Sequence, residues 1–160
     1  MIVNGIPRRV TPTDMSSIPR RSRLAHLILS LCLIGPGGLS ADTVAHIGEI
    51  REFSGPDDLE LDPNRVVVAI DVFGDSDRMV NGVLFETDKS AVPNVTVTAS
   101  HSIDGWTSRP DYSGADASSV ANLEEIMRDI RWTQAPNPVS VTVTGLTPGI
   151  EYELQMLFNE

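Results

Sequence analysis

Residues 139–156 read VSVTVTGLTPGIEYELQM, and this stretch carries the clearest structural pattern in the chain. Apolar and polar residues alternate over 139–144 and again over 150–156. Such alternation is typical of strands that bury one face, and the intervening Gly-Leu-Thr-Pro-Gly link is rich in turn residues. The stretch therefore predicts two antiparallel strands joined as a hairpin.

Several other segments are predicted to be strands, because each is a short apolar or alternating run bounded by turn residues. The strongest is a β-branched run at residues 65–73, which indicates a buried strand. The others are residues 80–85 with a bend at Asn81-Gly82, residues 94–99, and a short strand near the start of residues 44–63. Residues 100–119 are rich in Gly, Ser, Asp and Pro and are expected to form an ordered loop.

One amphipathic helix is predicted from residue 120 to residue 130. Its apolar residues recur at steps of three and four, which places them on one face: Val120, Leu123, Ile126, Met127 and Ile130. Ser118 or Ser119 is expected to cap the start of the helix. Glu124 and Arg128 are spaced for a favourable i,i+4 ion pair.

Strands that follow one another in runs, with a single helix, favour an antiparallel β-sandwich over a parallel α/β sheet. This mainly β domain is predicted to span residues 64–160. It has fewer predicted strands than the seven or so of an ordinary sandwich, and the sequence stops directly after one of them. We therefore expect the domain to be incomplete at its C-terminal end.

The first 41 residues are predicted to be a secretory signal peptide. They contain five Arg and one Asp, whereas residues 42–160 contain 7 Lys+Arg and 21 Asp+Glu, so the net charge changes from +4 to −14. A positive n-region at 1–23 precedes an apolar h-region at 24–34, and Ala41 offers a small residue for cleavage near 41/42.

The predicted leader sets the expected location of the protein. Its apolar run of about eleven residues is shorter than the roughly 20 that a spanning helix needs. We expect a secreted, periplasmic or cell-surface protein that contacts a membrane only through an uncleaved leader. An uncleaved membrane anchor is the alternative interpretation. The mature chain would begin with an acidic segment at residues 42–63.

The composition excludes several classes of protein. With 12 Lys+Arg against 22 Asp+Glu, the chain has a formal net charge of −10, which argues against nucleic acid as a partner. The single cysteine, Cys32, lies in the predicted leader and excludes an internal disulfide framework or a cysteine-rich zinc site.

Residues 141–158, VTVTGLTPGIEYELQMLF, resemble a segment of bacterial extracytoplasmic β-sandwiches. The closest group is the galactose-binding-like, malectin-like carbohydrate-binding modules, and this resemblance implies a β-sandwich of the jelly-roll type. In these modules an apolar strand, an N-G-V-x-F segment and a GLTPG hairpin occur in the order found here at 66–73, 81–85 and 145–152. The resemblance covers about residues 64–160 and lacks the family's later strands. It implies a module that binds carbohydrate or another cell-surface polymer.

A second resemblance is to fibronectin type III domains. Residues 146–152, LTPGIEY, are similar to the corner of those domains in which a tyrosine hydroxyl bonds back to the backbone. This resemblance implies a structural spacer of a larger surface protein. The predicted helix does not belong in such a domain.

Candidate ligand-binding residues lie in the loop after residue 100. Sugars stack their C–H faces on aromatic rings while charged side chains bond their hydroxyl groups. The residues that could do so here are Trp106, Tyr112, Asp104, Arg109 and Asp111. The alternative is that Trp106 and Tyr112 pack down on the core. Trp132, directly after the predicted helix, is expected to pack in the core.

Asp71, Asp75 and Asp77 offer hard oxygen ligands, so structural calcium is the one cofactor that the sequence indicates. Their spacing is not that of an EF-hand loop. The alternative is a solvated acidic face.

Phe73-Gly74-Asp75-Ser76 resembles the first block of the GDSL-type esterases, with Ser76 as the nucleophile. The D-x-x-H segment that would supply the base is absent from the sequence, and so is the strand–helix alternation of that fold. We therefore expect a non-enzymatic exported module that binds carbohydrate or mediates adhesion, with the fibronectin-like spacer and the esterase fragment as alternatives.

Overall fold

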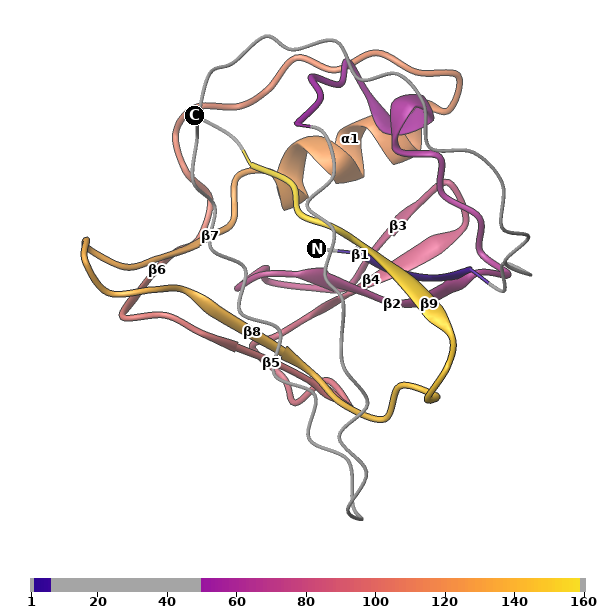
Figure 1. Cartoon of the computed structure of the whole chain (residues 1–160). Coiled ribbons are helices and arrows are strands. Elements are labelled where there is room, and N and C mark those ends of the chain that lie inside the picture. Colours follow the sequence, from indigo (N-terminus) through magenta and orange to yellow (C-terminus); the bar gives the residue numbers. More distant parts are fainter. Residues whose placement is uncertain (1, 7–49, 159–160) are drawn as a thin grey trace, which may run out of the picture.

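The computed structural model describes residues 2–6 and 50–158, which are mainly strands with one short α-helix (Figure 1). The elements, in chain order, are β1 (Ile2–Ile6), the 3₁₀ helix η1 (Pro56–Leu59), β2 (Val66–Asp71), β3 (Arg78–Val80), β4 (Val83–Thr87), β5 (Val95–Thr98), β6 (His101–Ile103), α1 (Ala117–Ile126), β7 (Ile130–Trp132), β8 (Ser140–Val143) and β9 (Glu151–Gln155). Within these residues, no helix has the length and apolar character needed to cross a membrane.

The strands form one larger sheet and two ribbons. The larger sheet has the order β3-β4-β2-β1-β9, and only its β2–β4 pair is parallel. β5 pairs with β8 and β6 pairs with β7, both antiparallel. Two strands were therefore predicted correctly: the apolar run at 65–73 contains β2, and the alternating stretch at 94–99 contains β5.

β2 lies at the centre of the molecule and is covered on both faces. On one face Ile70 packs with Val95 of β5 and Val141 of β8. On the other face Ala69 packs with Phe85 of β4 and Leu123 of α1. The five-stranded sheet is thus the middle layer, with the β5–β8 ribbon on one side and α1 with η1 on the other (Figure 1). A strand buried on both faces reads as a continuous apolar run, as residues 66–70 do.

The predicted hairpin at 139–156 is wrong in its pairing, although both arms are strands. β8 pairs with β5, and β9 pairs with β1 in the other sheet. The link between them crosses from one layer to the next, with Gly145 and Gly149 at φ 72° and 81°. Tyr152 closes the corner, because its hydroxyl accepts a hydrogen bond from the backbone N–H of Thr147 at 3.0 Å. Alternation specifies which face of a strand is buried but not which strand it pairs with.

The predicted bend at Asn81-Gly82 is a turn that separates two strands. β3 and β4 pair antiparallel around it, with Val80 opposite Val83. Asn81 and Gly82 have φ values of 47° and 79°. Two successive positive φ angles are what a two-residue hairpin turn requires, and Asn-Gly is its preferred sequence.

The helix begins and ends earlier than predicted. α1 is capped by Asp116, whose carboxylate accepts from the backbone N–H groups of Ser118 and Ser119, so neither serine is the cap. Ile130 lies in β7 because the chain leaves the helix at Met127. The predicted loop 100–119 also contains a strand, β6.

The predicted i,i+4 ion pair is wrong. Arg128 pairs with Glu125 at 2.8 Å, because Glu124 turns to the preceding loop and accepts from Arg109 at 3.0 Å.

Most of the predicted leader, residues 7–41, lies outside the described residues, and so does the strand expected near the start of 44–63 up to residue 49. The rest of that acidic segment forms η1 and irregular chain. Residues 2–6 are described as β1, between β2 and β9.

Candidate functional site

The β6–β7 ribbon, His101–Trp106 with Arg128–Trp132, projects from one end of the layered body (Figure 1). Its strands pair in antiparallel register from His101 opposite Trp132 to Ile103 opposite Ile130. Pairing continues past the strands, because the backbone N–H of Trp106 donates to the carbonyl oxygen of Arg128 at 2.7 Å. The backbone that carries Trp106 is therefore held in place.

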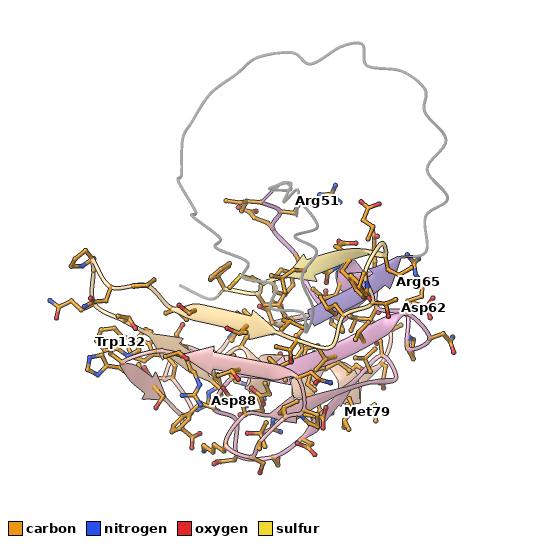
Figure 2. The ribbon with its side chains drawn as sticks, turned by 60° about the horizontal axis from the view of Figure 1, so that its bottom comes forward. Arg51, Asp62, Arg65, Met79, Asp88 and Trp132 are labelled. Atoms are coloured by element: carbon orange, nitrogen blue, oxygen red, sulfur yellow. The ribbon has the colours of Figure 1, made fainter. Side chains whose placement is uncertain are left out.

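The ribbon carries both tryptophans of the chain, and each is 42% exposed. The ring of His101 stacks on that of Trp132, with centroids 4.4 Å apart and planes at 25°. The expectation that Trp132 packs in the core is wrong, because β7 carries it away from α1 and out along the ribbon. In Figure 2, Trp132 lies at the end of the molecule opposite Asp62 and Arg65.

Polar groups at the base of the ribbon join it to the turn after β2. The ammonium group of Lys89 bridges Asp75 at 2.6 Å and Asp104 at 2.7 Å. Its bonds to Asp104 and then Asp75 raise the pKa of Lys89 to about 12, so the group stays charged at neutral pH. Asp104 thus stands with a cation beside it, two residues before Trp106.

A second connection fixes β7 to the body. Arg131 donates to both carboxylate oxygens of Asp88, at 2.7 and 2.9 Å. Asp88 also accepts from the backbone N–H of Phe73 at 2.6 Å. Two cations lie over the Phe73 ring, with Lys89 Nζ 4.7 Å and Arg131 Cζ 5.1 Å from its centroid. The ribbon is therefore anchored on both of its strands.

The structure divides the predicted ligand-binding loop. Asp104 and Trp106 lie on the ribbon, whereas Tyr112 lies over the core beside α1, with its ring centroid 5.2 Å from that of Phe53. Tyr112 and Arg109 are both tied to Glu124, through bonds of 3.2 and 3.0 Å. For Tyr112 the core-packing alternative therefore holds.

Asp111 is exposed, next to Tyr112. The five predicted residues are thus in two groups, and carbohydrate binding by them stays a prediction. The sequence signal that was missed is a short period of two, in which His101 and Ile103 flank Ser102, and Ile130 and Trp132 flank Arg131.

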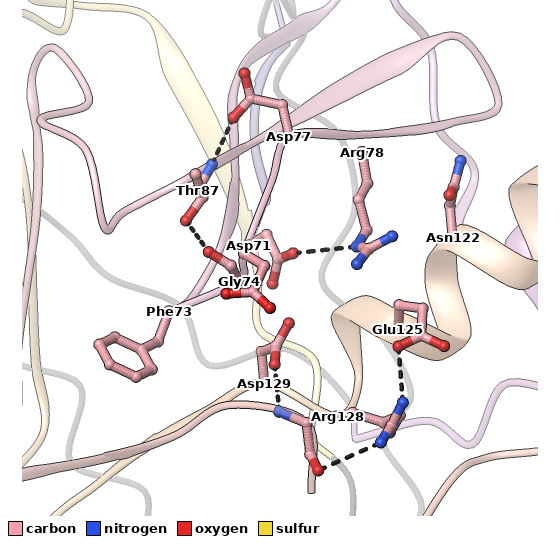
Figure 3. Close-up of polar contacts among 12 residues, drawn as sticks. Asp71, Phe73, Gly74, Asp77, Arg78, Thr87, Asn122, Glu125, Arg128 and Asp129 are labelled. Atoms are coloured by element: carbon pink, nitrogen blue, oxygen red, sulfur yellow. Dashed lines mark hydrogen bonds and ion pairs between the residues drawn. The ribbon is translucent and has the colours of Figure 1, made fainter.

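Asp71 is the last residue of β2, and its carboxyl group is buried on the α1 side of the sheet (Figure 3). Its side chain is 0% exposed, and neither carboxylate oxygen has a hydrogen-bond partner. The nearest cation is Arg78, whose Nε lies 3.8 Å away. Burial, and then the negative charge of Asp129, raise the pKa of Asp71 to about 7.

The turn after Asp71 is closely packed around this carboxylate. A Cβ atom at Gly74 would overlap Asp71 Oδ2, so any other residue there would require the Asp71 side chain to move. The Thr87 hydroxyl donates to the Gly74 carbonyl oxygen, and the Thr87 N–H donates to Asp77 Oδ1 at 2.9 Å (Figure 3). These contacts hold the turn against β4.

The three aspartates proposed as calcium ligands have separate surroundings. Asp71 is buried beside Arg78, Asp75 accepts from Lys89, and Asp77 accepts from the backbone of β4. Among residues 2–6 and 50–158, no group of three or more His, Cys, Asp or Glu side chains is arranged to hold a metal ion. Calcium binding stays a prediction.

Ser76 is exposed in the same turn. In the part of the chain that the structure describes, it makes no hydrogen bond with a histidine, and His101 is stacked on Trp132.

Comparisons with known proteins assign no family to the chain. No family model, no curated protein and no solved structure matches the chain.

Proposed function

We propose that this chain is an exported, non-enzymatic module that binds carbohydrate through its β6–β7 ribbon. The observation that carries the proposal is the pair of half-exposed tryptophans, Trp106 and Trp132, on one anchored ribbon. Flat aromatic rings offer a face for the apolar C–H surface of a sugar ring. Asp104 and Lys89 at the base of the ribbon supply an acceptor and a donor for hydroxyl groups.

The proposed scaffold is an antiparallel-type β-sandwich of the jelly-roll kind. The packing of Val95 and Val141 against Ile70 supports it, because this contact joins the β5–β8 ribbon to the five-stranded sheet face to face. Within such a scaffold, ligand sites are carried by loops and short ribbons at the ends of the layers. The β6–β7 ribbon lies at such an end (Figure 1).

The ligand is proposed to be a neutral polysaccharide. With a formal net charge of −10, the chain repels acidic polymers at long range. Carboxylates also outnumber cations among the charged groups on and against the ribbon, which are Lys89, Arg128 and Arg131 with Asp75, Asp88, Asp104, Glu125 and Asp129. Acidic glycans would be repelled by the net negative charge of the chain as they approach, and by the carboxylates once they reach the ribbon.

A fibronectin-like spacer is the second candidate, and one observation favours it. The hydroxyl of Tyr152 accepts from the N–H of Thr147 at 3.0 Å, which is the bond expected of a tyrosine corner. α1 packs on the sheet through Leu123 and Ile126, and such a helix is foreign to that domain type. A spacer has no need of an exposed aromatic ribbon.

Retention on glycans tests the proposal. The full chain is passed over arrays of neutral and acidic polysaccharides beside the Trp106→Ala and Trp132→Ala variants. Each ring removed is worth about 1 kcal/mol of stacking, so retention should weaken about fivefold for each variant. Phe158→Ala is the matched control, because Phe158 is 64% exposed and lies off the ribbon. If the parent chain binds no glycan, or the control weakens binding equally, the spacer is the better account.

A further inference from the structure

β1 occupies an interior position of the five-stranded sheet although it comes from the predicted leader. Ile2 to Ile6 pair antiparallel with Gln155 to Glu151 of β9 along the whole strand. On its other side β1 pairs antiparallel with β2, from Ile2 opposite Ala69 to Asn4 opposite Val66. One short strand therefore supplies the hydrogen-bonding partner for two strands of the body.

Removal of β1 would leave β2 and β9 without a hydrogen-bonding partner on the sides that β1 now occupies. β9 has no other strand partner in the described sheet, and on that side β2 would lose its partner from Val66 to Ala69. Both strands contribute to the core: Val68 of β2 and Leu154 of β9 pack in the cluster around Ile70. Unpaired backbone N–H and C=O groups beside an apolar core form a template for another strand.

We propose that the position between β2 and β9 is a strand-acceptor groove. In the unprocessed chain it holds Ile2–Ile6. In a chain cut near 41/42 it takes up an extended strand from another protein chain. The inference rests on the proposed export, because leader cleavage is the event that would empty the groove.

The structure defines what the occupant must be. It is an extended segment of about five residues that runs antiparallel to both β2 and β9, because β1 does so. Its sequence model is Ile-Val-Asn-Gly-Ile, which is uncharged and mostly apolar. Main-chain hydrogen bonds to two strands supply the affinity in this mode of recognition, known as strand addition.

The groove can be tested on the full chain without relying on export. A protease recognition sequence is inserted between residues 14 and 15, and the folded protein is cut in vitro. The probe is a synthetic peptide of residues 1–12 with a fluorescent label at its C-terminal end. We expect the cut segment to remain bound at first and then to exchange with the labelled peptide, seen as a rise in fluorescence anisotropy.

Two variant peptides make the test specific. Val3→Pro removes a backbone N–H from the middle of the strand, so the peptide should bind at least tenfold more weakly. Val3→Thr keeps both the N–H and a β-branched side chain and should bind about as well as the parent peptide.

Three results would overturn the inference. The first is no binding of the labelled peptide, and the second is equal binding of the Val3→Pro peptide. The third is aggregation of the cut chain that the peptide neither prevents nor reverses. Failure of the export proposal is distinguishable, because it appears as an intact N-terminus on protein recovered from cells and leaves the peptide assay unaffected.

Discussion

The core under α1 and the β6–β7 ribbon use large apolar side chains in opposite ways. Phe85 and Leu123 are fully buried between the sheet and the helix, whereas Trp106 and Trp132 are 42% exposed on the ribbon. The ribbon is nonetheless joined to the body through the contacts of Arg131 with Asp88 and of Asp104 with Lys89. Exposed aromatic rings on an anchored backbone are suited to contact a ligand, whereas buried apolar side chains stabilise the fold.

The same contrast holds for two aspartates near the end of β2. Asp88 accepts from Arg131 and from the Phe73 backbone, so its charge is compensated. The carboxylate of Asp71 has no hydrogen-bond partner, and its Oδ2 lies 3.8 Å from Arg78 Nε. A buried carboxylate without close donors lacks the hydration that it would have in the unfolded chain. Asp71 therefore opposes folding at neutral pH.

The largest expected effect is on the core. Phe85→Ala removes a fully buried ring from between β4 and α1 and should cost roughly 3–5 kcal/mol of stability. Urea unfolding of the full chain measures this difference. Phe158→Ala, at an exposed ring, should change stability by no more than about 0.5 kcal/mol. Equal effects of the two variants would remove the distinction between core and surface on which the comparison rests.

The second prediction concerns Asp71 and pH. Its pKa is 3.8 in the unfolded reference and about 7 in the folded chain, so the folded state binds the extra proton between these values. This aspartate should therefore lower the free energy of unfolding as pH rises from about 4 to about 7, by up to about 1.4 kcal/mol per pH unit, with no further change above. Asp71→Asn should remove this slope and raise the melting temperature at pH 8.

The control for this prediction is Asp75→Asn. Asp75 lies four residues away and is exposed, and its bond from Lys89 lowers its pKa. Its replacement should leave the slope between pH 4 and pH 7 in place. A lower melting temperature for Asp71→Asn at pH 8 would contradict the account, because it would mean that the Asp71–Arg78 pair stabilises the fold.

Local patterns predicted elements better than they predicted partners. The β-branched run of β2 and the alternation of β5 indicated strands because those patterns depend only on which faces are buried. The pairing of β8 with β5 and of β9 with β1 could not be predicted, since it depends on contacts between layers. Trp132 was misplaced for a related reason: the periodicity of α1 was extended past Met127, where the chain turns into β7.

The burial of Asp71 did leave a signal in the sequence, because it is a charge within the apolar run VVVAIDV. Neither interpretation of this residue, as a calcium ligand or as part of a solvated acidic face, predicted a buried carboxylate beside Arg78. The close approach of Gly74 and the absence of hydrogen-bond donors around its carboxylate are tertiary facts, and no local pattern encodes them.

Changes at the exposed tryptophans of the ribbon should have the smallest effect on stability. They also give the most direct test of the central claim, that the ribbon binds carbohydrate. The chain has two tryptophans, both on the ribbon, so tryptophan fluorescence reports on the proposed site alone. Quenching by acrylamide is measured for the parent chain and for Trp106→Phe and Trp132→Phe. Each is measured with and without a neutral polysaccharide to which the chain binds on the array. We predict that the polysaccharide lowers quenching in all three, because a stacked sugar covers the remaining ring. Unchanged quenching at a saturating concentration of polysaccharide would contradict carbohydrate binding at the ribbon.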